Sequence, residues 1–241
     1  MASPGERQQE IGRAYLHVLL GCLERSVKHF EALFDVLSTP DKLVFTGLSG
    51  EAFSFDAIGR FNHPLLLAEV FVESKGYAEG GGLYDQYKEF LAKAYSVSVS
   101  FNRHKRDLFW FVTNVPFAVS VGARLTSPEV VETVLTAERN ERVQRILGGA
   151  PIDKAQVRSL AKRLGVCIFT DSFIRWMGIS YKARAGDTVW SITKLVHAGR
   201  VPTTTFNEVT ALVGRLNNLQ DVNKIRSGQR LHLPWYGMPR T

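Results

Sequence analysis

Cysteine and long apolar runs are scarce in this chain. Only Cys22 and Cys167 occur among 241 residues, and both sit in apolar patterns, where a buried thiol is more common than a disulfide. No Cys/His cluster has the spacing of a zinc site. No stretch approaches eighteen consecutive apolar residues, and the first ten residues lack the apolar core of an export signal. These absences predict a cytoplasmic protein with no membrane partner.

Positive charge is concentrated in the last quarter of the chain. The whole sequence carries a formal net charge of +7. Residues 180–241 hold nine Lys or Arg and three Asp or Glu, whereas residues 1–179 hold 21 basic and 20 acidic residues. A chain of this length is comfortable for two domains, and we place their boundary between 179 and 180. The surplus favours a polyanionic partner such as DNA; the alternative is that it only keeps a small domain soluble.

The most informative pattern is a set of charged residues at the ends of two apolar runs. Residues 69–75 read Glu-Val-Phe-Val-Glu-Ser-Lys, and Asp56 lies seventeen residues before Glu73. Alternate side chains of a strand share a face, so Glu73 and Lys75 lie on the same side. If the two runs form a hairpin, Asp56 meets Glu73 and Lys75 at one end. Two carboxylates and an ammonium group then converge on a small volume.

Such a set suits the hydrolysis of a phosphodiester bond. Divalent cations such as Mg²⁺ or Mn²⁺ prefer oxygen ligands, which Asp56, Glu73 and the carbonyl of Ser74 can supply. The ammonium group of Lys75 can orient a water molecule or stabilise charge on the phosphate. The alternative interpretation is a solvated Glu-x-Lys ion pair on a strand edge, although the apolar run before Glu73 makes an unpaired charge costly there.

The spacing of Asp56, Glu73 and Lys75 resembles the core of the PD-(D/E)xK nuclease superfamily. The resemblance implies an α/β fold, a restriction-endonuclease-like mixed sheet flanked by helices. It also implies that the acids hold the metal and that the lysine acts on the attacking water. Some members place a Gln-x-x-x-Tyr pair on the next helix; here Gln86 fits that place, but Phe90 stands where the tyrosine would be.

Hydrophobic spacing and end signals predict the remaining elements of the first 179 residues. A cap residue followed by proline starts a helix at Ser127, and Asp153 caps the next one. The expected elements are an amphipathic helical pattern over 8–37, a strand at 43–45, a helix at 83–95, a strand at 109–113, a helix from Ser127 to Leu147, a helix from Asp153 to Gly165, a strand at 166–169 and a short helix between Asp171 and Gly178.

Residues 181–234 resemble a LysM domain. They begin Tyr-Lys-Ala-Arg-Ala-Gly-Asp-Thr-Val-Trp and end Ser-Gly-Gln-Arg-Leu-His-Leu-Pro. The resemblance implies a small βααβ domain, although residues 198–205 make the middle longer than usual. In LysM domains two loops form a shallow groove for N-acetylated sugar polymers. Mapped onto this chain, the groove residues are Asp187, Thr188, Trp190, Asn217 and Ile225.

Two classes of function follow from these features. The first is a Mg²⁺-dependent endonuclease whose basic LysM-like module contacts DNA or a protein partner, with defence against foreign DNA as a common role of the superfamily. The second is a non-catalytic binding or assembly protein that uses a nuclease-like scaffold and a module for glycan or protein. One active site commonly cuts one strand, so cleavage of a duplex would imply a homodimer or sequential nicks.

Overall fold

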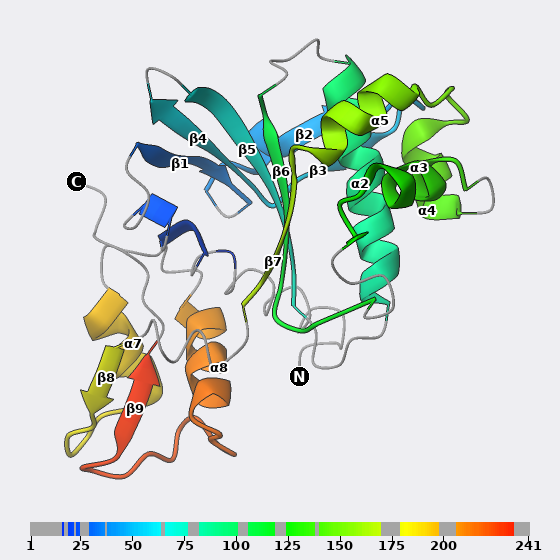
Figure 1. The fold of residues 1–241 in the computed structure, drawn as a ribbon. Helices are drawn as coiled ribbons and strands as arrows, with labels where there is room; N and C mark the ends of the chain where they lie inside the picture. The colour runs from blue at the N-terminus through cyan, green and yellow to red at the C-terminus, as the bar shows by residue number, and fades with distance from the viewer. Residues whose placement is uncertain are drawn as a thin grey trace.

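The fold is taken from a computed structural model of the chain (Figure 1). It describes most of the chain between residues 16 and 233. The described residues are 16, 19–21, 23, 24, 29–36, 38–63, 66–76, 82–100, 106–118, 124–137, 140–169, 179–197 and 206–233.

A mixed five-stranded sheet forms the centre of the larger part of the molecule. The strand order is β1-β4-β5-β6-β7. The β1–β4 and β4–β5 pairs are antiparallel, whereas the β5–β6 and β6–β7 pairs are parallel. The protein therefore has the α/β class expected from its sequence, with a mixed sheet flanked by helices. The strands are β1 (Phe30–Asp35), β4 (Ala57–His63), β5 (Leu66–Lys75), β6 (Leu108–Thr113) and β7 (Leu164–Ile168).

The two parallel connections carry the helices that cover one face of the sheet (Figure 1). The segment from β5 to β6 contains α2 (Leu83–Ser100), which extends beyond the expected helix at 83–95. The described residues between β6 and β7 form three short helices. Alternation along β5 places Phe71 in the core shared with these helices, while Val70 and Val72 pack on the other face against Leu16 and its helical neighbours. The three short helices are α3 (Pro128–Leu135), α4 (Glu141–Leu147) and α5 (Lys154–Ala161).

A small two-stranded ribbon leads into the sheet just before Asp56. After η1 (Pro40–Leu43), β2 (Val44–Thr46) pairs with β3 (Ala52–Ser54) in antiparallel register. The strand expected at 43–45 is thereby confirmed. The turn of the ribbon packs against the end of α4, because a Cβ atom at Gly47 would lie 2.6 Å from the carbonyl oxygen of Ile146. The ribbon is therefore held beside α4, which matters for the ion pairs described below.

The amphipathic pattern over 8–37 is not a single helix. The described residues from 16 to 24 are helical, but β1 pairs with β4. His29 has a φ of 69°, in the left-handed region that ends a helix. The register shifts between Ala32 and Phe34, and this bulge brings Phe34 against the α2 face. The helical prediction for 30–35 is wrong because a four-residue spacing of phenylalanines also fits a bulged strand.

The helix predicted from Ser127 to Leu147 is two helices. The Ser127 side chain caps α3 by accepting from the Val130 N–H, as expected. α3 then ends at Leu135, and the Asn140 side chain accepts from the Val143 N–H to start α4. Asn140 offers the backbone a local alternative to a continuous helix, so the periodicity of the buried residues does not reveal the break. The Asp153 cap of α5 and the strands at 109–113 and 166–169 are confirmed within one or two residues.

The last part of the chain forms a βααβ unit with its own core. β8 (Ile179–Lys182) pairs antiparallel with β9 (Arg230–Leu233), and α7 (Val189–His197) packs against α8 (Phe206–Leu216). Phe169 packs against this core and also against the core under the large sheet. The short helix expected between Asp171 and Gly178 lies outside the described residues.

The structure also bears on the apolar runs and on the cysteines of the sequence. No helix in the described ranges has both the length and the apolarity needed to cross a bilayer. Cys167 carries a free, half-buried thiol, and burial raises its pKa, as expected for an unreactive packing residue. Cys22 lies outside the described residues.

Candidate active site

The hairpin of β4 and β5 brings Asp56, Glu73 and Lys75 together. Asp56 stands at a bend just before β4, and its N–H donates to the Val72 carbonyl oxygen at 2.9 Å. Its Oδ2 accepts from the Ser74 N–H at 2.7 Å and lies 3.5 Å from the Lys75 Nζ. The predicted convergence of two carboxylates and a lysine is confirmed as geometry.

Glu73 is the buried centre of the cluster. Its side chain is 3% exposed, and its Oε1 lies 2.7 Å from the Lys75 Nζ and 2.9 Å from the Lys93 Nζ. The second oxygen, Oε2, is also buried but has no hydrogen-bond partner among the described residues. A buried polar atom without a partner is costly, which makes Oε2 a candidate for an additional ligand.

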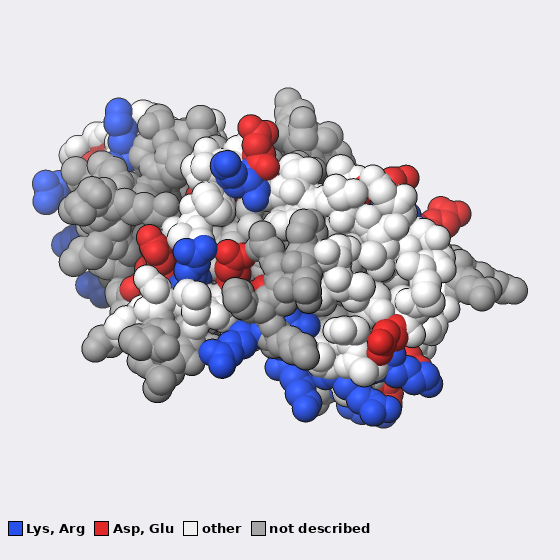
Figure 2. Space-filling model, turned by 90° about the horizontal axis from the view of Figure 1, so that it is seen from above, with Lys and Arg blue, Asp and Glu red and all other residues white. Residues whose placement is uncertain are grey.

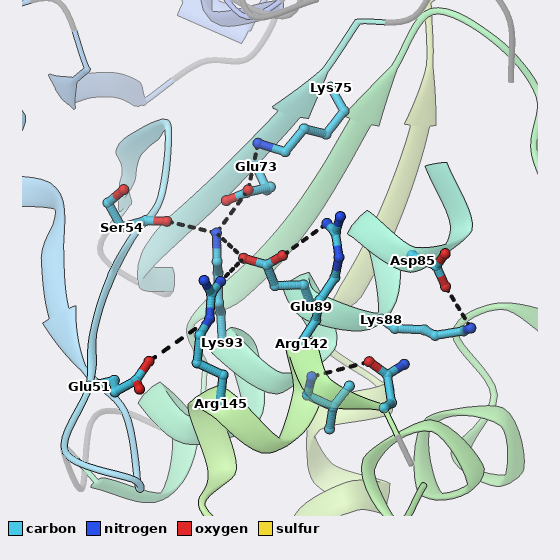
Figure 3. A network of polar contacts seen from close by, with 12 residues as sticks. Glu51, Ser54, Glu73, Lys75, Asp85, Lys88, Glu89, Lys93, Arg142 and Arg145 are labelled. Carbon is cyan, nitrogen blue, oxygen red and sulfur yellow. Dashed lines mark hydrogen bonds and ion pairs between the residues drawn. The ribbon is translucent and has the colours of Figure 1, made fainter. Parts of the chain in front are cut away.

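Lys93 is a member of the cluster that the sequence pattern did not reveal. Its ammonium group comes from α2, on the helical side of the sheet, and contacts the Ser54 carbonyl oxygen at 3.0 Å as well as Glu73 (Figure 3). Lys93 is 7% exposed and lies between the buried residues Phe90 and Val97. A lysine in the middle of an otherwise buried helical stretch was the available signal, since a buried ammonium group needs an anionic partner.

A chain of ion pairs extends from Lys93 to the surface (Figure 3). Glu89 lies one helical turn before Lys93, with 3.8 Å between its Oε1 and the Lys93 Nζ. Arg142 and Arg145 of α4 contact the same carboxylate at 3.4 and 3.0 Å. Glu51 of the ribbon lies 3.9 Å from Arg145. The outer pairs are half exposed and individually weak, whereas the Lys93–Glu73 pair is shielded from water.

The cluster perturbs the pKa values of its members in different directions. Burial raises the pKa of Asp56 above its ordinary value. The charge of Lys75 lowers this pKa and the charge of Glu73 raises it, but burial is the largest effect. Burial acts in the same direction on Glu73, but Lys75 and Lys93 outweigh it and hold the pKa of Glu73 below its ordinary value. Burial alone would lower the pKa of Lys75, yet the two carboxylates raise it far above its usual range. Glu73 is therefore the anion that the lysines stabilise most strongly.

The donor set fits a magnesium ion better than a metal that needs many protein ligands. No group of three or more His, Cys, Asp or Glu side chains in the described part of the chain is arranged to hold a metal. Mg²⁺, however, commonly uses one or two carboxylates, keeps several waters and binds substrate phosphates. Asp56 and Glu73 provide two carboxylates, and the partnerless Oε2 of Glu73 offers an available oxygen. Ser74, which follows Glu73 and is also buried, was the third predicted ligand.

Gln86 lies on α2 but does not join the cluster. It is half-buried, two helical turns before Lys93, and its side-chain amide forms no hydrogen bond with another described residue. Its neighbours on α2 line a separate groove of about 540 Å³ between α2, α3 and α4. Neither Asp56 nor Glu73 lines that groove, which contains Tyr84, Asp85, Lys88, Thr133, Val134, Ala137, Asn140, Glu141 and Arg142.

The residues predicted to line a LysM groove play different parts in the βααβ unit. Asp187 accepts hydrogen bonds from the Tyr181 hydroxyl and the Arg184 N–H, which closes the first turn. Thr188 Oγ1 accepts from the Ser191 N–H and caps α7. Trp190 is 43% exposed, with the Lys194 Nζ 5.1 Å from its ring centre. Of these, Trp190 presents the largest surface to a ligand.

Asn217 and Ile225 contribute to the internal structure of the same unit. The Asn217 amide donates to the His232 carbonyl oxygen, and its Oδ1 accepts from the His232 N–H at 2.7 Å. The side chain thus acts as a partner for β9. Ile225 is partly buried against the core of the unit. Both residues lie in the segment between α8 and β9, where sequence spacing alone does not distinguish packing from ligand contact.

The cluster of Asp56, Glu73, Lys75 and Lys93 is the described site with the most distinctive chemistry. It combines two carboxylates of opposite pKa shift with two ammonium groups at one end of β5. Comparisons of the chain with protein-family models, with curated proteins and with solved structures found no match.

Proposed function

We propose that this protein is a divalent-cation-dependent endonuclease that hydrolyses DNA phosphodiester bonds. The observation that carries the proposal is the convergence of Asp56 and Glu73 beside Lys75, with one buried oxygen of Glu73 lacking a hydrogen-bond partner in the described part of the chain. A mixed sheet flanked by helices, with the acids at the β4–β5 hairpin, is compatible with a PD-(D/E)xK nuclease fold. The proposed biological role is defence against foreign DNA; repair and element mobility are the alternatives.

The residues divide the chemical work between them. Asp56, Glu73 and the Ser74 carbonyl would hold Mg²⁺ or Mn²⁺, which supplies charge stabilisation and an activated water when bound. The Lys75 side chain is 25% exposed, so its ammonium group can reach a phosphate oxygen or the attacking water. Lys93 contacts both the Ser54 carbonyl oxygen and Glu73 Oε1, so it would still stabilise Glu73 if Lys75 turned to the substrate. The other oxygen of Glu73 would be the one available to hold the cation.

The proposed activity is tested by incubating the protein with supercoiled plasmid and Mg²⁺ or Mn²⁺. Nicked or linear DNA is expected with either ion, and EDTA should abolish the reaction. An RNA of matched length forms a second arm, because the site does not distinguish DNA from RNA by itself. Accumulation of nicks before linear product would indicate single-strand cuts, whereas direct linearisation would indicate a homodimer. Absence of DNA cleavage with both Mg²⁺ and Mn²⁺ would contradict the proposal, and cleavage of RNA alone would show that the substrate is RNA rather than DNA.

Lys75→Met is expected to separate catalysis from metal binding. The variant removes the ammonium group but leaves both carboxylates, so Mg²⁺ affinity should be retained or increased while cleavage falls by about 100-fold. Lys75→Arg should restore little, because a planar guanidinium differs from a compact ammonium group. Calorimetric titration of Mg²⁺ beside the cleavage assay measures both effects. Full activity of Lys75→Met, or loss of its metal binding, would show that the assigned role is wrong.

A non-catalytic binding or assembly protein remains the second candidate, and one observation favours it. Lys75 and Lys93 already neutralise the charges of Asp56 and Glu73 without a metal. A cluster whose charges are balanced by its own lysines can stabilise the fold without binding a metal. Titration with Mg²⁺ and Mn²⁺ separates the two candidates, since a purely structural cluster would show no saturable binding that depends on Asp56.

We assign the βααβ unit a role in contact with nucleic acid or with a protein partner. Its order of elements and its glycine turns are compatible with a LysM-like domain, for which an N-acetylated glycan is the alternative ligand. Figure 2 shows acidic and basic side chains lying close together at several places on the face seen from above. Residues 1–179 are nearly neutral, whereas residues 180–241 hold nine basic and three acidic residues. The surplus suits a polyanion better than a neutral sugar polymer.

A further inference from the structure

The solvent face of the β8–β9 pair carries an unusual arrangement of positive charge. Along β9, buried residues alternate with exposed ones, so Leu231 faces the core while Arg230 and His232 face solvent. The register places Lys182 of β8 directly opposite Arg230 of β9. Both side chains are exposed, so two cations stand side by side on the same face of the pair.

Two further cations lie at the same end of the β8–β9 pair. The turn that carries Arg226 is bonded to the residue after Lys182, because the Gly228 N–H donates to the Ala183 carbonyl oxygen. A Cβ atom at Gly228 would lie 4.0 Å from the Lys182 Cε, so the lysine stem extends over this turn. Arg184 follows directly after Ala183. Like Lys182 and Arg230, Arg184 and Arg226 are exposed.

These cations are not used by the fold. None of Lys182, Arg184, Arg226 and Arg230 forms an ion pair with a residue in the described ranges. The described carboxylates of the unit are engaged elsewhere. Asp221 contacts Lys224, and Asp187 accepts from Tyr181 and Arg184 N–H. Like charges placed opposite each other across two strands destabilise the pair, so this arrangement costs folding stability rather than adding to it.

We propose that the basic face formed by Lys182, Arg184, Arg226 and Arg230 binds the phosphate backbone of a nucleic acid. The inference rests on the proposed nuclease function for the choice of partner. Phosphate contacts position a protein on nucleic acid without reading its sequence, and exposed Lys and Arg are the residues that make them. The described side chains on this face of β8 and β9 are basic or histidine. A lipid surface is a weaker fit, because stable membrane attachment usually needs an apolar contribution as well.

The test measures binding of the full-length protein to a labelled DNA duplex in EDTA at several salt concentrations. Lys182→Gln/Arg230→Gln is expected to weaken binding and to reduce the slope of log affinity against log salt by about 1.8, because each phosphate contact contributes about 0.9. The variant should remain folded, since it removes a like-charge pair. Thermal unfolding of the variant, expected at or above the wild-type temperature, verifies this.

The matched control is Arg158→Gln/Lys162→Gln at the C-terminal end of α5, because neither residue forms an ion pair with a described residue. It removes one lysine and one arginine, both exposed, at the end of the molecule opposite the β8–β9 pair (Figure 1). Its salt slope should stay close to the wild-type value. Equal slopes for the two double variants would overturn the proposal, because net charge alone would then explain binding. Salt-insensitive binding to chitin oligomers, or binding to phosphatidylserine vesicles without binding to DNA, would also overturn it.

Failure of this proposal and failure of the nuclease proposal give different results. Binding in EDTA needs no catalysis, so a protein that binds DNA through this face but never cuts it would support the basic face and contradict the proposed activity. If the wild-type protein cuts DNA but the Lys182→Gln/Arg230→Gln variant keeps the wild-type salt slope, the result would support the proposed activity and contradict the basic face.

Discussion

Asp56→Asn is expected to reduce divalent-cation-dependent DNA cleavage by about 100-fold or more while the protein stays folded. Loss of residues that only support a metal ligand already costs about 10–100-fold, so loss of a charged ligand should cost at least as much. The asparagine can still accept from the Ser74 N–H, which preserves the local backbone contact. Plasmid cleavage and calorimetric titration of Mg²⁺ on the same preparation measure the expected losses of rate and metal affinity.

The stability of Asp56→Asn can be predicted from the sign of the pKa shift. A raised pKa means that the folded protein disfavours the ionised carboxyl relative to the unfolded chain. This penalty is absent below the unfolded pKa and fully present once the pH exceeds the folded pKa. Near neutral pH, the uncharged asparagine should therefore leave the unfolding free energy unchanged or raise it. A folded Asp56→Asn protein with undiminished cleavage would contradict the assignment of Asp56 as a metal ligand.

Lys93→Met is expected to lower the free energy of unfolding by about 3 kcal/mol. Removing one partner of a buried ion pair leaves uncompensated charge, and the Ser54 carbonyl oxygen also loses its donor. Lys75 still contacts Glu73, which places the loss toward the lower end of the range for buried pairs. Chemical denaturation monitored by the buried aromatic residues would measure the change.

Lys88→Met is the matched control on the same helix. Lys88 pairs with Asp85, whose side chain is 56% exposed, and its Nζ lies 4.7 Å from the centre of the Tyr84 ring. Contacts of this exposed kind contribute about 1 kcal/mol or less. If Lys93→Met were no more destabilising than Lys88→Met, the buried pair would not be the support for Glu73 that its geometry indicates.

The position of Glu73 also determines which substitution gives a clear answer about catalysis. Glu73→Ala would leave the buried Lys93 with Glu89 as its one carboxylate partner among the described residues, and would therefore combine loss of a proposed metal ligand with loss of stability. Asp56 is 26% exposed and is not held between two ammonium groups, so its replacement isolates the chemical role. For this reason Asp56→Asn is the more informative variant, although the sequence gives the two acids equal weight.

The sequence by itself determined the features that depend on neighbouring residues. Alternation along 69–75 placed Glu73 and Lys75 on one face, and side-chain caps located the starts of α3 and α5 at Ser127 and Asp153. These features are set by strand pleat and by unsatisfied backbone groups at helix ends, which act over a few residues. The α/β class was expected from the resemblance to the PD-(D/E)xK superfamily, and the mixed sheet flanked by helices agrees with that class.

Only the tertiary structure decided the features that depend on distant partners. The bulge in β1 arises from pairing with β4. The break between α3 and α4 is stabilised by the Asn140 cap, and the hydrophobic periodicity of the sequence does not change there. Lys93 belongs to the site because α2 packs against the end of β5 and brings its ammonium group to Glu73. Asn217 supports β9 because the later strand β9 lies beside it and the His232 N–H donates to its side chain. Helical and strand spacings are compatible with several partners, so long-range packing selects the one that satisfies each buried charge and backbone group.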